Sequence, residues 1–166
     1  MTKSNERLRL AEEFLLGQIP LTRAMGLRVV PDADHGFAIE APVALNHNHL
    51  QTAFGGSINA VATLAGYAFL WLELNDAAVH VVIRASQIRF LRPIRETIRA
   101  VCLPPGREAM ERFQATLRAG GKARLDLTVR VEERGVAAEF DGSFLALADK
   151  LPKEISPSPS GVKPDG

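Results

Sequence analysis

The sequence predicts an α+β fold in which a mostly antiparallel sheet wraps around one long, buried helix. The segment from Gly55 to Leu72 contains no charged residue and has the length of a helix. A helix that is apolar on every side must be surrounded by other elements or lie in a membrane. The segments before and after it alternate apolar and polar residues and are joined by short turns, which is typical of antiparallel strands with one buried face. Runs of strands around a single long helix define the α+β class.

Composition and charge favour one globular domain over residues 1–148. The chain has 166 residues, of which 46% are hydrophobic and 23% charged, and its net charge of +1 gives no electrostatic reason to expect a nucleic-acid partner. Its single cysteine, Cys102, excludes an intramolecular disulfide and favours a reducing, cytoplasmic location. Cys102 lies in an apolar run, so we expect it in the core; the alternative, a nucleophile, would need a lowered pKa that these neighbours do not suggest.

The two termini and the central helix were compared with the patterns of export signals, membrane spans and disordered tails. The first residues are charged where a signal peptide would be apolar, so we expect no export. The central helix is the one membrane candidate, but its polar and small residues dilute it and basic anchors do not flank it, so we expect no membrane span. From Asp149 the chain is rich in Pro, Ser, Gly and Lys, which predicts a disordered tail over 149–166.

The elements before the central helix can be placed from spacing. Apolar residues at helical spacing predict an amphipathic helix over about 6–17, ended by Gly17 and Pro20. Strand-favouring residues over 25–30, turn residues around 31–36 and alternation over 37–43 predict a hairpin.

Four strands and a small helix are expected after the central helix. Residues 79–92 and 97–103 predict two strands that form a hairpin, and 106–117 predict a short helix closed by glycines. The cleanest alternation lies over 124–132. A last strand follows over 136–147, with Gly142 as the expected site of a β-bulge.

Three segments carry a resemblance to a known family. IPLTRAMGLRV, LNHNHLQTAFGGS and the strand ending SQIRFLRPI resemble the YiiD C-terminal-type putative thioesterase domain of the hotdog-fold thioesterase superfamily, over roughly Ile19 to Ala148. This group is similar to the stand-alone malonyl-acyl-carrier-protein (malonyl-ACP) decarboxylases. The resemblance implies a hotdog fold, with a six-stranded sheet around the helix, and a homodimer or dimer of dimers with its site at the subunit interface. It also implies acyl thioesters of ACP or CoA as substrates, with no cofactor.

The start of the central helix is the candidate site. A helix N-terminus leaves backbone N–H groups unpaired and partly positive, and Gly55 and Gly56 allow a ligand to approach them closely. A thioester carbonyl placed there would have its developing oxyanion stabilised. The alternative is that the two glycines only allow the helix to pack closely against a strand.

The resemblance also separates two reactions. In similar hydrolytic families a His precedes the Gly pair and a helix carboxylate lies two turns in; those positions hold Phe54 and Thr63 here. No Asp, Glu or His lies between Gly55 and Leu72, so the group that would activate water is missing. Loss of CO2 from a malonyl thioester needs an oxyanion site but no such base. We therefore prefer decarboxylation, with hydrolysis through a partner's base or Glu73, or a non-catalytic acyl-binding module, as alternatives.

Polar residues around the Gly pair are the further site candidates. By the resemblance, Asn48 takes the place of an active-site Asn, and Thr52 offers a hydroxyl; both would orient substrate. Asn46, Phe54, Ser57 and Thr63 are candidates for substrate binding. Each has a structural alternative: Asn46 and Asn48 as turn caps, and Thr52 as the helix cap. Ser57 lacks the second glycine of a nucleophile elbow.

The remaining candidates are basic and aromatic. Arg89 and Arg92, within a set that also holds Arg84, Arg95 and Arg99, would bind the phosphate of a phosphopantetheine arm or an acidic carrier protein; the alternative is a solvated strand face. His47 and His49 lie two apart, as metal ligands can, but no third ligand is spaced suitably, so we expect no metal site. Tyr67, Phe69 and Trp71 are expected in the core or in the wall of an acyl pocket.

Overall fold

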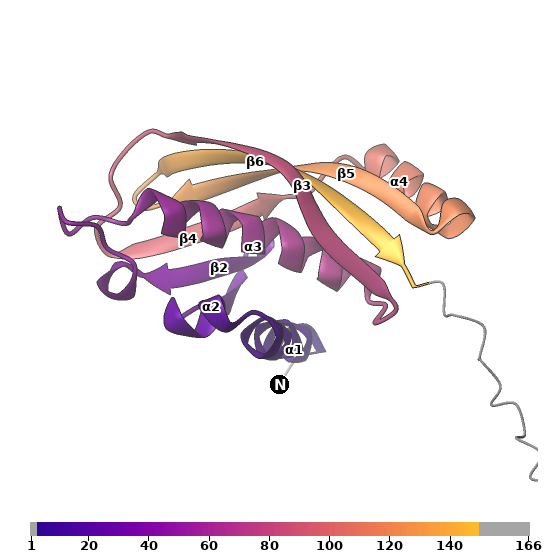
Figure 1. The fold of residues 1–166 in the computed structure, drawn as a ribbon, viewed down its shortest axis with the longest axis horizontal. Helices are drawn as coiled ribbons and strands as arrows, with labels where there is room; N and C mark the ends of the chain where they lie inside the picture. Colours follow the sequence, from indigo (N-terminus) through magenta and orange to yellow (C-terminus); the bar gives the residue numbers. More distant parts are fainter. Residues whose placement is uncertain (1–2, 150–166) are drawn as a thin grey trace, which may run out of the picture.

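The computed structural model describes residues 3–149, which form one antiparallel sheet around a central helix (Figure 1). Along the chain the elements are α1 (Lys3–Gln18), α2 (Pro20–Ala24), β1 (Arg28–Asp32), β2 (Gly36–Pro42), a 3-10 turn (Val43–Leu45), α3 (Gly55–Leu74), β3 (Val79–Phe90), β4 (Thr97–Leu103), α4 (Arg107–Gly120), β5 (Lys122–Glu132) and β6 (Val136–Ala148). The strands are ordered β1-β2-β4-β5-β6-β3. The predicted α+β class and the six-stranded sheet around one helix are confirmed.

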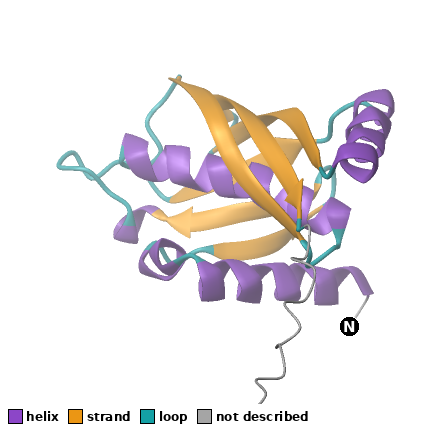
Figure 2. Ribbon diagram, turned by 45° about the vertical axis from the view of Figure 1, so that its right-hand side comes forward, coloured by secondary structure: helices purple, strands orange, loops and turns teal. Residues whose placement is uncertain are grey.

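The central helix α3 lies in the concave face of the sheet, and Figure 2 shows the strands curving around it. An 18-residue window of α3 has a mean hydropathy of 1.3, enough by composition for a membrane span, yet 56% of that window is buried inside the fold. α3 is therefore a core helix. The uncharged sequence predicted that α3 is covered on every side, but this is not so. A partly exposed stripe runs along it and consists of Asn59, Thr63, Tyr67 and Trp71, each four residues after the last.

Glycines bring the middle of α3 and the sheet together. A Cβ on Gly66 would lie 2.5 Å from the ring of Phe144, which is fully buried. A Cβ on Gly142 would lie 2.6 Å from Phe140 and 2.8 Å from Phe144. The β-bulge expected at Gly142 is wrong, because the register of β6 shifts against β3 between Ile83 and Ala85 and not at Gly142. Gly142 instead makes room for the two rings that pack on the helix.

The strands β3 and β4 do not form the expected hairpin. β3 pairs with β6 at the edge of the sheet, while β4 lies between β2 and β5. The connection between β3 and β4 passes the ends of β5 and β6, where the Glu133 carboxylate accepts the backbone N–H groups of Arg95 (3.0 Å), Glu96 (2.7 Å) and Thr97 (3.3 Å). These bonds replace the tight turn that a hairpin would need.

The N-terminal elements differ from the prediction in their bounds. α1 is longer than 6–17, and Pro20 begins a second short helix, since proline suits the first turn. β1 starts at Arg28, not at residue 25, because Gly26 at φ +65° follows α2. At the other end, Asp149 is held to the fold by its N–H, which donates to Ala78 O (2.7 Å). The rest of the tail expected to be disordered, 150–166, lies outside the described residues.

Candidate functional site

The first turn of α3 presents free backbone donors. Phe54 is the N-cap residue and provides no side-chain hydrogen bond. Within residues 3–149, the N–H groups of Gly55, Gly56 and Ser57 have no hydrogen-bond partner, and Ile58 N is the first to bond back, to Phe54 O (3.0 Å). Three aligned donors at the positive end of a 20-residue helix form a ready site for an oxyanion.

Two half-exposed aromatic rings lie over these glycines. A Cβ on Gly55 would lie 3.3 Å from the tip of Phe90, and a Cβ on Gly56 would lie 2.4 Å from the ring of Phe54. The Phe54 and Phe90 residues are 55% and 53% exposed, so the rings border the amides without burying them. The close-packing interpretation of the glycines therefore holds in part: Gly55 does meet the end of β3.

A pocket of about 320 Å³ opens beside Gly55. Its wall is mostly apolar, with one cation, and consists of Ala53, Gly55, Ile58, Phe90, Leu91, Arg92 and Pro93. None of these lining residues carries a carboxylate or an imidazole. The pocket can therefore hold an apolar chain beside an anionic or carbonyl oxygen, but its own wall supplies no base at neutral pH.

Arg92 is held at this pocket by the β5–β6 turn. Its Nε donates to Val136 O (3.1 Å), its Nη2 lies 3.4 Å from Glu133 O, and its backbone N–H donates to Ala137 O (3.1 Å). The preceding loop is tied to the same region, because Ala53 N donates to Ile94 O (2.8 Å). The fold thus brings Arg92 beside Gly55, across 37 positions of sequence.

Asn48 and Thr52 form a closed loop before the helix. Asn48 Oδ1 accepts the N–H groups of Leu50 (2.9 Å) and Thr52 (3.2 Å), and Asn48 Nδ2 donates to Thr52 Oγ1 (3.0 Å). Gln51, at the tip, has φ +58°, a conformation that costs energy in a non-glycine residue. Neither Asn48 nor Thr52 lines the pocket at Gly55. The helix-cap interpretation of Thr52 is wrong, since Phe54 is the N-cap.

Asn46 has a structural role in this geometry. Its side chain is buried, and Nδ2 donates to Met25 O and Pro42 O, both at 2.8 Å. The expected substrate contact through Asn46 is therefore not supported, because the amide donors are already used to join the segment after α2 to the end of β2.

The polar residues of the helix itself are differently placed. Thr63 Oγ1 donates to Asn59 O (2.9 Å), so its single proton is used inside the helix. Ser57 is partly exposed in the first turn and does not line the pocket. Asn59 was missed by the sequence reasoning: it lies four residues after Gly55 on the same face, and its amide has no partner within residues 3–149. The i, i+4 spacing from Gly55 was the available signal.

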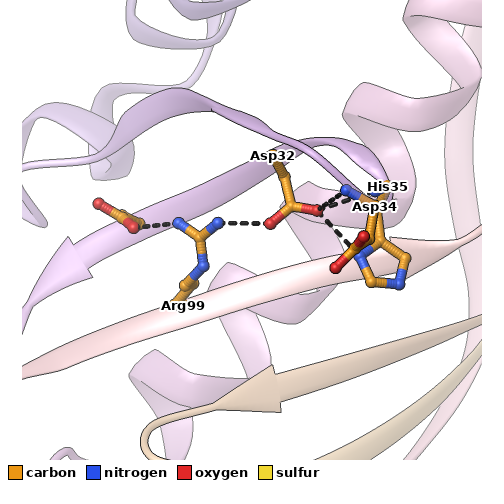
Figure 3. A network of polar contacts seen from close by, with 5 residues as sticks. Asp32, Asp34, His35 and Arg99 are labelled. Carbon is orange, nitrogen blue, oxygen red and sulfur yellow. Dashed lines mark hydrogen bonds and ion pairs between the residues drawn. The ribbon is translucent and has the colours of Figure 1, made fainter.

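The arginines do not form one patch, because β3 and β4 are not neighbours. Arg89, on the edge strand, pairs with Glu139. Arg99, on β4, lies between Glu40 and Asp32, and Figure 3 shows its guanidinium facing Asp32 (2.6 Å). Burial raises the pKa of Asp32, but the His35 backbone N–H and the Arg99 guanidinium outweigh this effect and lower it to about 2. Arg99 therefore belongs to a structural network and is not available to a ligand.

Other candidates lie away from Gly55. Cys102 is 1% exposed and burial raises its pKa to about 12, so it is a core residue, as expected. Glu73, the alternative base, lies about 27 Å from Gly55 along α3, at about 1.5 Å per residue. Trp71 stacks on Phe14 with ring centroids 5.1 Å apart, and Tyr67 on the same ring at 6.3 Å.

Comparison with known proteins gives a consistent result. The family model described as "Putative thioesterase (yiiD_Cterm)" matches residues 9–148. A Shewanella oneidensis structure described as a putative thioesterase is 27% identical, with a TM-score of 0.76, over 86% of this chain and 99% of that one. A Chlorobaculum tepidum TLS protein of unknown function is 23% identical, with a TM-score of 0.82, over 88% and 97%. A Pseudomonas aeruginosa protein described as a probable thioesterase is 24% identical, with a TM-score of 0.71, over 85% and 95%.

Proposed function

This chain belongs to the putative thioesterase family (yiiD_Cterm) and has the hotdog fold of the thioesterase superfamily, and from that membership we propose that it is an enzyme acting on an acyl thioester of ACP or CoA. Its preferred reaction, in this proposal, is decarboxylation of malonyl-ACP to acetyl-ACP, which would supply fatty-acid synthesis. The observation that carries the proposal is a set of three amides at the start of α3 that have no partner in the described part of the chain, beside a pocket wall that holds an arginine and no base.

The reaction needs little beyond this arrangement. The thioester carbonyl oxygen accepts hydrogen bonds from the amides of Gly55 and Gly56. The carboxylate leaves as CO2, and the electrons of the broken C–C bond form the enolate of the acetyl thioester. The amides then stabilise the full oxyanion, and a proton from water returns the carbon to a methyl group. A wall without a carboxylate favours this path, because it adds no negative charge beside the enolate.

Neighbouring groups would orient the substrate. Arg92 would hold the malonyl carboxylate or the phosphate of the pantetheine arm, for which a guanidinium is well suited. Asn59, one turn into α3, would add an amide donor on the face of Gly55. Asn48 and Thr52 would act mainly by fixing the loop that leads to the Gly pair, although one Asn48 N–H remains for a ligand. Ser57, Thr63 and Arg89 keep the weaker role of nearby polar groups.

Hydrolysis of the same thioester is the second candidate, and the family description favours it. It would need a base from a second subunit, since Glu73 of the same chain lies at the far end of the helix. Incubation with malonyl-ACP, followed by mass measurement of the carrier, separates the outcomes. Acetyl-ACP supports decarboxylation, a free carrier thiol supports hydrolysis, and persistent binding without turnover supports an acyl-binding module. Malonyl-CoA in parallel tests the carrier, and Gly55→Val is the matched inactive control.

We also propose a homodimer, or a dimer of dimers, built on the β3 edge. β3 has 12 residues and exposes Val82 and Ile83 (45% and 37%) along an unpaired edge, an arrangement that invites pairing. The opposite edge, β1, has five residues, includes Pro31 and packs against α1. Pairing two β3 strands would also bring a second copy near the exposed stripe of α3. Ile83→Lys should convert the dimer to monomers in sedimentation; an unchanged mass would contradict this assembly.

The single cysteine, buried and unpaired, fits a cytoplasmic location.

A further inference from the structure

A second cavity lies at the opposite end of α3 from Gly55. Its volume is about 470 Å³, within the range of roughly 300–1,000 Å³ typical of small-molecule sites. Five segments converge on it: α1, the β1–β2 turn, the end of α3, the β4–α4 link and the first turn of α4. The chemistry at the start of α3 makes no use of it, since no residue is shared by the two pockets.

The floor of this cavity is apolar and firmly packed. It is formed by Leu8, Phe37, Phe69 and Leu72, each 5–8% exposed, and Met110 adds a flexible wall from α4. The floor side chains come from three elements, α1, β2 and α3, so the floor does not depend on one segment. A floor of this kind favours an alkyl or aryl chain over a polar ligand.

The mouth carries donors that are held in place. Arg7 Nη2 donates to Leu72 O at the negative end of α3, which fixes the guanidinium at the cavity. The same guanidinium makes no other hydrogen bond within residues 3–149, so most of its five N–H donors remain free. His35 Nδ1 lies 3.0 Å from Asp32 Oδ1, and Figure 3 draws this contact. Nε2 has no hydrogen-bond partner within residues 3–149 and is the ring nitrogen left for the cavity.

We propose that this cavity binds a small amphipathic carboxylate, with its chain on the apolar floor and its head on Arg7, next to His35. A carboxylate matches the planar fork of a guanidinium and can take two parallel N–H bonds. Glu73 is the one carboxylate in the wall, and it forms no ion pair within residues 3–149. It selects against ligands with a second negative charge and limits affinity. This binding does not rest on the proposed catalytic function.

Calorimetry with three probes of equal chain length tests the ligand class: octanoate, octanol and octylammonium. Octanoate should bind at least tenfold more tightly than either of the others. Equal binding of all three would overturn the proposal, because it would reduce the cavity to a nonspecific apolar surface. Tighter binding of octylammonium would overturn it too, since Glu73 would then be the head-group partner.

Variants locate the site. Met110→Trp should fill the cavity and abolish octanoate binding, and Arg7→Gln should weaken it at least tenfold. Glu73→Gln should strengthen it severalfold, a gain that a loss of folding cannot imitate. Arg112→Gln, on α4 but outside the cavity, is the matched control and should change nothing. Gly55→Val should also bind octanoate normally; loss of binding there, with retention in Met110→Trp, would assign the carboxylate to the first pocket and refute the second site.

Discussion

The two ends of α3 differ in how far their backbone hydrogen-bonding groups are paired. At the C-terminal end, Asn75 adopts a left-handed conformation and donates to Trp71 O (3.1 Å), and Arg7 donates to Leu72 O from a distance of 65 positions. At the N-terminal end no side chain caps the helix and three amides stay unpaired within residues 3–149. The fold satisfies one end by a long-range contact and leaves the donors of the other end available to a ligand, as the proposed function requires.

Blocking the open end should have the largest effect. In Gly55→Val the branched side chain would occupy the space where a carbonyl approaches the amides and would push on the Phe90 ring. Keeping the carbonyl from one such donor costs about 3 kcal/mol, so kcat/KM on malonyl-ACP should fall by roughly 100-fold. The thermal midpoint should change little, because Phe90 is half exposed and can move. Unchanged turnover would show that the amides do not contact substrate.

A glycine in the middle of the same helix should behave in the reverse manner. Gly66→Ala places a methyl group 2.5 Å from the buried Phe144 ring, which has no space to move. Overpacking of this kind costs about 1–3 kcal/mol of unfolding free energy. Urea unfolding should show that loss, while kcat of the folded fraction stays within about twofold of wild type. A fully stable Gly66→Ala protein would contradict the packing described for α3.

Low pH should lower the free energy of unfolding through Asp32, which contacts His35 in the wall of the second cavity. The Asp32 carboxyl has a pKa of about 2 in the folded protein against 3.8 as its ordinary value. The ionised Asp32 carboxylate therefore stabilises the folded protein fully at any pH above its unfolded-state pKa. This contribution, about 2 kcal/mol of unfolding free energy, is lost as the pH falls from about 4 through about 2. Urea unfolding across this range checks it. Asp32→Asn, which cannot titrate, should lack this component; an equal acid loss in both proteins would locate the effect elsewhere.

Removing the hydrogen bond from Arg7 at the C-terminal end of α3 should have the smallest effect on stability. Arg7→Met keeps much of the apolar stem but removes the bond to Leu72 O, at a cost of about 1 kcal/mol. For a domain of this size the thermal midpoint should fall by about 2–4 °C, with turnover nearly unchanged. Differential scanning calorimetry measures the shift. If turnover fell instead and stability did not, the two ends of α3 would be coupled in a way that the contacts do not explain.

The sequence pattern was sufficient for the six strands, for α1, α3 and α4, and for the start of α3, but not for α2 or for the tertiary contacts between the elements. Alternation and the uncharged run placed the strands and α3, since periodicity is a local property. The strand order was not predictable: β3 lies at the edge beside β6, and the loop that follows it is held by Glu133, a contact between residues far apart in sequence. The same holds for Phe90 over Gly55 and for Arg7 at Leu72 O.

Site assignments failed where a side chain had a long-range structural partner. Asn46 sits in a segment rich in candidate residues, yet its amide joins Met25 O to Pro42 O. Arg99 seemed to belong to a basic hairpin, but its strand lies beside β2, and it pairs with Glu40 on β2 and with Asp32 at the end of β1. In both cases the residue type suggested a ligand contact, and only the tertiary partner reveals the structural role.

The amide resonances of Gly55, Gly56 and Ser57 test the central claim most directly. A ketone analogue of the acyl-pantetheine arm, with CH2 in place of sulfur, keeps the carbonyl but cannot turn over. On titration, NMR should show downfield proton shifts of these three amides as they donate to the carbonyl oxygen, and Gly55→Val should abolish the shifts at positions 56 and 57. If the analogue binds while these amides stay unchanged and signals from Phe69 and Leu72 move, the open end of α3 is not the thioester site.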